Sequence, residues 1–214
     1  MSTWTSKGLG AALLAGAAFA LAGCEEGAGL PLVPPGGGGG LTLGPAAPPS
    51  TLTLAGGEVT LAAPSGYCFD KRSVKRTARG GFAVLARCDT LGAKGSFVGY
   101  DLALITVAAM PRAAEAKALT PEAVARTAGP VKVLDRRSVG RVALVLLADG
   151  PHEMEGVARV HWRAAFSASG HLVGLGFYAP EGSSVLGSQG RLLLEEMAEK
   201  TRAASASARS AKAE

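Results

Sequence analysis

The pattern that most constrains the fold is a pair of alternating segments on either side of residues 167–170. Every second residue is apolar on both sides: Val160, Trp162, Ala164 and Phe166 before the loop, and Val173, Leu175 and Phe177 after it. A period of two is typical of half-buried strands, and the sequence Ser-Ala-Ser-Gly favours a turn. A four-residue loop would place Phe166 opposite His171 and Ala164 opposite Val173. The sequence therefore predicts an antiparallel hairpin with one apolar face, which a one-residue slip would expose.

Further strands are expected along the chain, because short apolar segments alternate with turn signals. The expected strands cover residues 59–63, 82–89, 100–109, 131–134 and 141–148. Pro111 should end the third of them. Residues 71–80 are basic and polar, and are expected to form a loop or a short helix.

Two helices are expected on this sheet. Thr120 is a good N-cap before Pro121, and Gly129 stops the helix. A C-terminal helix should begin at Ser183 or Ser184. Its expected buried stripe is Leu193, Leu194, Met197 and Ala204. The order of elements predicts the α+β class, an antiparallel sheet packed with two main helices.

The length of the chain suits one globular domain with extra segments. The chain has 214 residues, of which 48% are hydrophobic and 18% charged, so disorder throughout is excluded. We assign residues 58–204 to the domain and expect the small, polar residues 205–214 to fray.

A short apolar run lies near the N-terminus. Lys7 is the only charged residue before position 25, and the 13 residues at 9–21 are all Leu, Ala, Gly or Phe. A helix of that length spans only about 20 Å, which is too short for a bilayer but typical of a signal peptide. The sequence Leu21-Ala22-Gly23-Cys24 follows and resembles a bacterial lipobox.

The lipobox resemblance implies removal of residues 1–23 and attachment of lipid to Cys24. The chain would then be a membrane-anchored lipoprotein of the bacterial cell envelope, with its domain facing the periplasm. Glu25 and Glu26 do not assign it to the inner or the outer membrane. An ordinary secretory signal with a chance cysteine is the alternative.

A segment rich in glycine and proline separates Cys24 from the first expected strand. Residues 25–50 contain 14 Gly or Pro among 26, and such a chain has an r.m.s. span of roughly 25–30 Å. We therefore expect residues 24–57 to be the lipidated cysteine and a flexible tether. The tether either lets the domain search near the membrane or is a plain spacer.

The globular part resembles the PsbP-like fold. The resemblance rests on AAPSGYCF at 62–69 after the first strand, on the mid-chain helix, and on GHLVGLGFYAP at 170–180 before the terminal helix. It implies a twisted antiparallel sheet between helices. Because PsbP-like domains mostly act in assembly or docking, it also implies a non-catalytic role, and no cofactor residues carry over. The chain is similar as well to lipoproteins of alphaproteobacteria.

Cys68 and Cys88 remain once Cys24 is assigned to lipid. An even pair in an exported chain predicts a disulfide, which would stabilise the fold by roughly 3 kcal/mol. A redox or metal pair is the alternative, but the chain has no CxxC spacing to support it.

Five basic residues cluster within nine positions: Lys71, Arg72, Lys75, Arg76 and Arg79. They could contact anionic lipid headgroups or an acidic partner, and each could gain about 1 kcal/mol near a membrane surface; the alternative is a solvated loop. The net charge of +5 is mild, and the dense basic stripe with interleaved aromatic residues of a nucleic-acid binder is missing. No nucleic-acid partner is expected.

Catalytic and metal-binding motifs are missing from the chain. It has no GxSxG, SxxK or HExxH sequence. The expected hairpin places His161 on its outer face opposite Gly176 and His171 on its apolar face, so the two cannot share a metal. Gly174 and Gly176 would leave a flat strand surface for a helix. We expect no metal and no cofactor.

Three hypotheses for function follow. The leading one is a non-catalytic lipoprotein that binds or positions an envelope protein partner at the membrane surface. The second is an envelope hydrolase with an unrecognised site, such as a titratable pair of His152 and Glu155 in a polar loop. The third is a structural protein that binds cell-wall polymer or lipid through residues 71–79.

Overall fold

The computed structural model describes residues 47–91, 102–112, 119–148 and 156–212. Cys24, the expected signal peptide and most of the expected tether lie outside these ranges, as do His152 and Glu155. The described residues belong to one compact unit that begins at residue 44.

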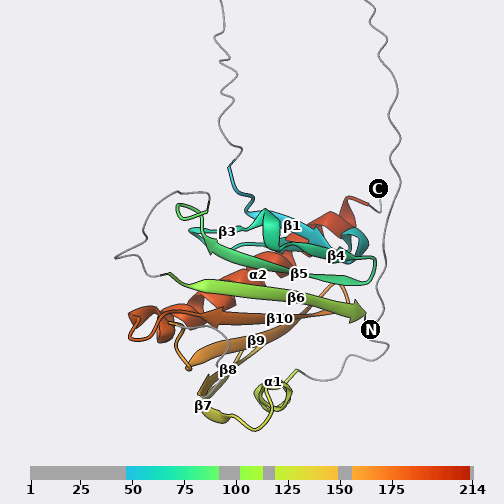
Figure 1. Ribbon diagram of the computed structural model, residues 1–214. Helices are drawn as coiled ribbons and strands as arrows, with labels where there is room; N and C mark the ends of the chain where they lie inside the picture. Colours follow the sequence, from blue (N-terminus) through green and yellow to red (C-terminus); the bar gives the residue numbers. More distant parts are fainter. Residues whose placement is uncertain (1–46, 92–101, 113–118, 149–155, 213–214) are drawn as a thin grey trace, which may run out of the picture. The chain divides into compact units, whose positions relative to one another are not determined.

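Within these ranges the chain forms short 3₁₀ turns, strands and two α-helices (Figure 1). In chain order the elements are β1 (Thr51–Leu54), η1 (Ala55–Gly57), β2 (Val59–Ala62), β3 (Tyr67–Phe69), η2 (Lys71–Ser73), β4 (Lys75–Thr77), β5 (Gly80–Arg87), β6 (Leu104–Arg112), α1 (Pro121–Thr127), β7 (Lys132–Val139), β8 (Val142–Ala148), β9 (His161–Ala168), β10 (His171–Tyr178), η3 (Ser184–Leu186) and α2 (Ser188–Ser210).

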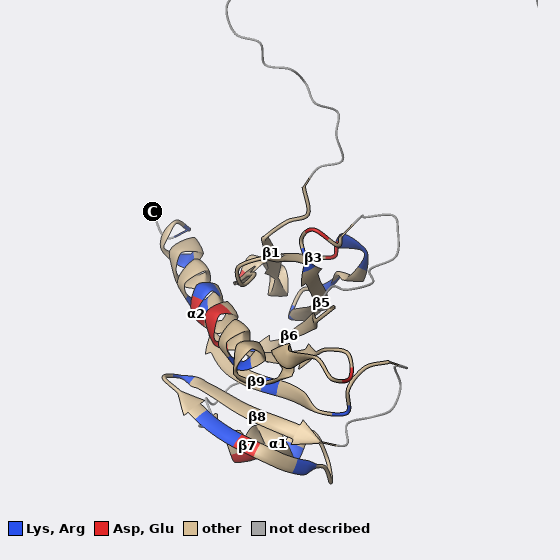
Figure 2. Ribbon diagram, turned by 90° about the vertical axis from the view of Figure 1, so that its left-hand side faces the viewer, with Lys and Arg blue, Asp and Glu red and all other residues tan. Residues whose placement is uncertain are grey.

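One large antiparallel sheet organises the fold. Its strand order is β3-β5-β6-β10-β9-β8-β7, and β4 also pairs with β5. Helix α2 packs against β2, β8, β9 and β10, whereas α1 contacts β7, β8 and β9. In Figure 2, α2 and α1 lie on different sides of the sheet. The predicted α+β class, an antiparallel sheet with two helices, is therefore confirmed.

The core lies mainly between the sheet and α2. Fully buried side chains there include Phe69, Phe166, Phe177, Leu194 and Met197. A smaller cluster forms where Val124 of α1 meets Val145 and Leu147 of β8. Consecutive β8 residues therefore contribute to both clusters, as expected for a strand that is covered on each face.

The β9–β10 hairpin has the predicted apolar face but a shorter loop. Its register pairs Ala168 with His171 and Phe166 with Val173, so the predicted four-residue loop is wrong. Ser169 and Gly170 form a two-residue turn in which both have positive φ, 51° and 80°. Such a turn matches the right-handed twist of the strands. Because the register moves by two residues, every side chain keeps its face.

Two strands extend beyond their predicted ends. Strand β6 runs through Pro111, which was expected to stop it, because the register between β6 and β10 shifts at that point and a bulge tolerates proline. Strand β7 continues to Val139, so the expected loop at 136–140 shrinks to a turn at Gly140 and Arg141. Charged residues on this outermost strand suit an edge that must not pair further.

The ordered domain is longer than predicted at both ends. Strand β1 lies inside the expected tether, which was drawn to residue 57, because it pairs with β2 from Thr51 to Leu54. Helix α2 starts at Ser188, not at Ser183 or Ser184, which precede or begin the η3 turn. It continues to Ser210, so the expected fraying from residue 205 is wrong.

Two hydroxyl groups of α2 explain this ordering. Ser205 Oγ accepts a hydrogen bond from the backbone N–H of Thr60 (3.0 Å) and donates to its carbonyl (3.1 Å). Thr201 Oγ1 makes the same pair of bonds with Ala62 (3.1 and 3.4 Å). The two residues are one helical turn apart and fully buried. The helix thereby satisfies backbone groups of β2 that β1 does not reach.

Candidate functional site

The five predicted basic residues lie in the segment that joins β3 to β5. Lys71 and Arg72 belong to η2, Lys75 and Arg76 to β4, and Arg79 to the turn before β5. All five are exposed. We call residues 71–79 the basic segment. It contains a short strand that the sequence did not predict. This strand, β4, pairs with β5 through Lys75, Arg76 and Thr77.

The basic segment is tightly connected to its surroundings. Asp70 caps η2 by accepting a hydrogen bond from the backbone N–H of Arg72 (3.0 Å), and it also pairs with the guanidinium of Arg72. Hydrogen bonding from Arg72 lowers the pKa of Asp70. Gly80 and Gly81 allow β5 to approach its neighbours closely, since a Cβ on Gly80 would lie 2.4 Å from the carbonyl oxygen of Ala109.

The basic segment lies where the chain enters the domain. Lys71 and Arg76 line a cavity of about 500 Å³ together with Pro49, Thr51 and Thr53. Arg76 Nε donates a hydrogen bond to the carbonyl of Thr53 in β1 (3.2 Å). The positive charges are therefore next to the first described residues of the chain.

A disulfide joins Cys68 to Cys88, as predicted, with their Cα atoms 4.9 Å apart. Cys68 is in the middle of β3, and Cys88 directly follows β5. The basic segment lies between them, within the closed loop. The bond and the β3–β5 pairing therefore hold both ends of the segment in place.

The two described histidines are both buried. His171 lies on the apolar side, as predicted, although it faces Ala168 rather than Phe166. His161 was expected on the outer face opposite Gly176, but Gly176 pairs with Arg163. His161 is only 2% exposed and stacks on Tyr178, with ring centroids 5.1 Å apart. That face is covered near His161, which alternation alone could not reveal.

His171 joins a charged group that the sequence did not predict. Its Nε2 lies 2.6 Å from Oε2 of Glu58, and its Nδ1 lies 2.8 Å from the carbonyl oxygen of Met110. Both ring nitrogens of His171 are therefore engaged by oxygen atoms from distant parts of the chain. Arg112 also donates to Glu58 (3.1 Å). Hydrogen bonding from His171, with the charge of Arg112, lowers the pKa of Glu58.

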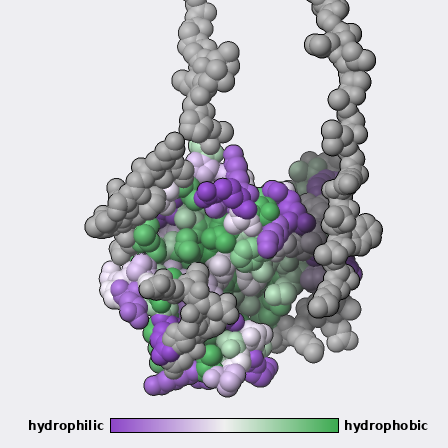
Figure 3. Space-filling model, in the orientation of Figure 1, coloured by the Kyte–Doolittle hydropathy of each residue, from purple (hydrophilic) through white to green (hydrophobic). Residues whose placement is uncertain are grey.

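An apolar groove lies on the sheet face opposite α2. Its volume is about 310 Å³, and its lining includes Phe82, Ala108, Met110, Val124, Leu172 and Gly174. Figure 3 shows apolar side chains gathered over the middle of this face. The predicted helix packing over Gly174 and Gly176 is wrong: a Cβ on Gly174 would meet nothing within 4 Å, and Tyr178 and Thr106 fill the space beside Gly176.

Two features of the described residues bear on other classes of function. No helix among them is both long and apolar enough to cross a bilayer. They contain no group of three or more His, Cys, Asp or Glu side chains placed to hold a metal ion. The hydrolase pair of His152 and Glu155 lies outside the described ranges and stays a hypothesis.

The groove and the Glu58 group had only weak signals in the sequence. Gly174 and Gly176 marked the groove, but their alternation fits an open surface as well as a covered one. Glu58 is next to the predicted strand at 59–63 and 113 residues before His171, so no local spacing connects the two. In comparisons with known proteins, no family model, curated protein or solved structure matches the chain.

Proposed function

We propose that this chain is a lipoprotein of the bacterial cell envelope, anchored through lipid on Cys24, and that its domain is a non-catalytic binding or assembly module. In this proposal the basic segment rests on anionic lipid headgroups. The domain faces the periplasm, and a protein partner binds at the sheet. The lipobox Leu21-Ala22-Gly23-Cys24 and the disulfide support export of the chain.

One observation carries the proposal: the basic segment lies where the chain enters the domain. Pro49 shares a cavity with Lys71 and Arg76. A chain anchored at Cys24 would approach the domain from that end. A tether there would bring these positive charges within reach of the bilayer surface, where attraction falls off over about 10 Å.

The anchor is tested on the protein purified from its native membrane. We expect intact mass spectrometry to show a chain that starts at Cys24 and carries at least two acyl chains, as stable anchoring requires. Cys24→Ser should retain residues 1–23. An unmodified N-terminus in the native protein would contradict the proposal.

The basic segment is tested by sedimentation of residues 25–214, which lack the acylation site, with vesicles that contain phosphatidylglycerol. The variant carries Lys71→Ser, Lys75→Ser and Arg79→Ser, which spares Arg72 and Arg76 because they hold local structure. At about 1 kcal/mol per charge, vesicle affinity should fall by about a hundredfold. A control that removes the same charge from Arg126, Lys132 and Arg136 should bind normally. Equal loss in both variants would contradict the proposal.

The apolar groove is the surface to which we assign the protein partner. Apolar surface that is left open on a small domain favours a binding site. Gly174→Phe should fill the groove without unfolding the domain, since nothing lies within 4 Å of a Cβ there. A photo-crosslinking residue placed at Met110, which is 45% exposed, should form a covalent adduct with an envelope protein in the parent chain. Gly174→Phe should abolish that adduct. Leu134→Phe, on β7, should keep it; an adduct that is insensitive to Gly174→Phe would refute this assignment.

The PsbP-like identity of the fold belongs to the same proposal. The large antiparallel sheet, with α2 on one face and α1 on the other, supports it. A solved structure of this chain that superimposes on a PsbP-like domain with the same strand order would test it.

A further inference from the structure

We propose that a cavity between α2 and the β7–β8 turn binds a small molecule or chemical group that carries two or more anionic groups, phosphates or carboxylates. We call it the arginine cavity and define it by six of its lining residues: Ser138, Arg141, Ser167, Ser169, Arg202 and Arg209. It is separate from the basic segment and from the apolar groove. This proposal does not depend on the membrane anchor.

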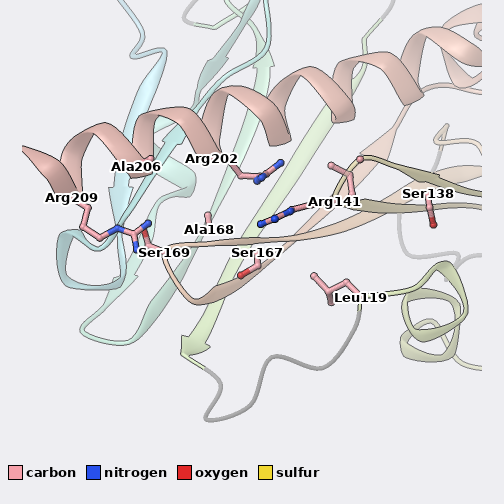
Figure 4. A pocket seen from close by; sticks show the side chains of 11 residues that line it. Leu119, Ser138, Arg141, Ser167, Ala168, Ser169, Arg202, Ala206 and Arg209 are labelled. Atoms are coloured by element: carbon pink, nitrogen blue, oxygen red, sulfur yellow. The ribbon is translucent and has the colours of Figure 1, made fainter.

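Three arginines from two elements reach this one space. Arg202 and Arg209 belong to α2, and Arg141 is at the tip of the β7–β8 turn. Figure 4 shows Arg141 and Arg202 extending into the gap from opposite walls, with Arg209 farther along the helix near Ser169. Arg202 and Arg209 are seven residues apart, which is about 10 Å along the helix axis. The charges are therefore spread over a length that suits more than one anionic group.

The fold presents Arg141 in a defined position. Val139 pairs with Val142, so Gly140 and Arg141 form a two-residue turn. Gly140 has a φ of 56°, whereas φ of Arg141 is not positive, the pattern of a type II′ turn with glycine first. A short hairpin turn of this kind holds the backbone of Arg141 firmly at the rim of the cavity.

The three guanidinium groups have no ion-pair partner among the described residues, unlike other cations of the same helix. Arg191 pairs with Glu195, and Lys200 pairs with Glu196. Glu199 lies one turn before Arg202 and makes no ion pair with it. No Asp or Glu in the described ranges lines the arginine cavity. Three unneutralised positive charges around one hollow create a potential that attracts an anion.

A carboxylate in an adjoining cavity is already engaged. Arg209 and Ser169 also line a smaller adjoining cavity of about 200 Å³, whose lining includes Glu58. Glu58 accepts hydrogen bonds from His171 and Arg112. Glu58 is therefore engaged by two other side chains, and it makes no ion pair with Arg209.

The remaining lining and the size of the cavity fit a small anionic ligand. Ser138 and Ser167 add hydroxyl groups that can donate to phosphate or carboxylate oxygens, whereas the hydroxyl of Ser169 donates to the carbonyl of Ser205 (3.5 Å). The volume is about 580 Å³, within the usual range of roughly 300–1,000 Å³ for ligand sites. Guanidinium groups bind both phosphates and carboxylates with paired N–H donors. The proposal therefore assigns a ligand with several oxyanion groups, and the experiment distinguishes phosphates from carboxylates.

The test is isothermal titration calorimetry on the purified full chain in a buffer free of phosphate and carboxylate. The probes are inorganic tripolyphosphate, citrate and orthophosphate. We expect saturable binding of tripolyphosphate, citrate or both, at least about tenfold tighter than that of orthophosphate, and weaker at higher salt. Binding of tripolyphosphate alone assigns a phosphate ligand, and binding of citrate alone assigns a carboxylate ligand.

Variants connect the binding to these residues. Arg141→Gln with Arg202→Gln should weaken the bound probe at least about tenfold, and Arg209→Gln alone should weaken it less. Arg126→Gln, an exposed arginine of α1 outside the cavity, is the matched control and should bind as the parent does. Unchanged melting temperatures show that the variants fold. The proposal is overturned if no multivalent probe saturates, if the double variant binds normally, or if the control loses as much affinity.

Discussion

At the level of single residues, the two buried histidines are held in opposite ways. His171 is placed between Glu58 and the carbonyl of Met110, so each of its ring nitrogens has a hydrogen-bond partner. His161 Nδ1 faces the carbonyl of Arg159 (3.2 Å), while its buried Nε2 has no hydrogen-bond partner among the described residues. Burial lowers the pKa of His161, and the nearby charge of Arg163 acts in the same direction. The fold therefore favours neutral His161.

This difference predicts a pH dependence of stability. The folded pKa of His161 lies below its unfolded value of about 6.5, so between the two values only the unfolded chain binds the proton. Stability should therefore fall as the pH drops below about 6.5. Urea unfolding at pH 7.5 and 5.5 should show a smaller loss in His161→Gln than in the parent chain. Parallel pH curves for the two proteins would show that His161 does not contribute.

At the level of elements, the edge of β2 depends on α2 rather than on another strand. A free strand edge can pair with other chains. Here the hydroxyls of Thr201 and Ser205 bind the outward backbone groups of Thr60 and Ala62. The helix side chains thereby make the backbone hydrogen bonds that a neighbouring strand would otherwise make. They also hold the helix along the β1–β2 hairpin.

Removing these hydroxyls should destabilise the domain. Thr201→Val keeps the shape of the side chain but leaves part-buried backbone groups of Ala62 without a partner. Ser205→Ala does the same at Thr60. Each should lower the free energy of unfolding by about 1–3 kcal/mol, measured by urea denaturation. Ser207→Ala, at an exposed position of the same helix, should change it little; a similar effect there would point to helix propensity instead.

The elements also show which features can be predicted from sequence. Helix α1 was predicted because its cap is local: Thr120 Oγ1 accepts from the N–H of Ala123, as its position before Pro121 indicates. The faces of β9 and β10 followed from alternation. The burial of Thr201 and Ser205 could not be predicted, because their partners lie 139 and 145 residues away. The predicted start of α2 was wrong for a similar reason. The η3 turn ends at Leu186, whose carbonyl accepts a hydrogen bond from Nε1 of Trp162 (2.8 Å), a residue distant in sequence, and α2 begins only after this turn.

The candidate site also combines features that could be predicted from the sequence with one that could not. The pairing of Cys68 with Cys88 was predicted from the chemistry of an exported chain. The exposure of the basic segment was predicted from its charge. Its place beside Pro49 depends on how β1 packs, and β1 was itself missed because residues 51–54 follow a glycine- and proline-rich stretch.

At the level of the whole domain, the disulfide stabilises the side that carries the basic segment. It joins β3, at one edge of the sheet, to the end of β5 across a separation of 20 residues. That loop contains η2, β4 and the whole of β5. Most of the remaining sheet is held by longer strands, whereas β3 and β4 pair with β5 over three residues each. The covalent bond therefore acts where the hydrogen-bonded pairing is shortest.

Loss of the disulfide should therefore weaken the fold measurably. Cys68→Ser with Cys88→Ser should lower the free energy of unfolding by roughly 3 kcal/mol. Urea denaturation of the parent chain with dithiothreitol should give the same midpoint as the double variant, and reductant should not change the variant. A midpoint that is insensitive to both treatments would show that the pairing of β3 with β5 is sufficient alone.

The contact of α2 with β2 also affects the order in which the polypeptide can mature. The β1–β2 hairpin cannot complete its hydrogen bonds until a helix synthesised some 140 residues later has left the ribosome. Until then, the nascent chain lacks helix α2, which covers its core. The domain can therefore become compact only after nearly all of its residues have been synthesised.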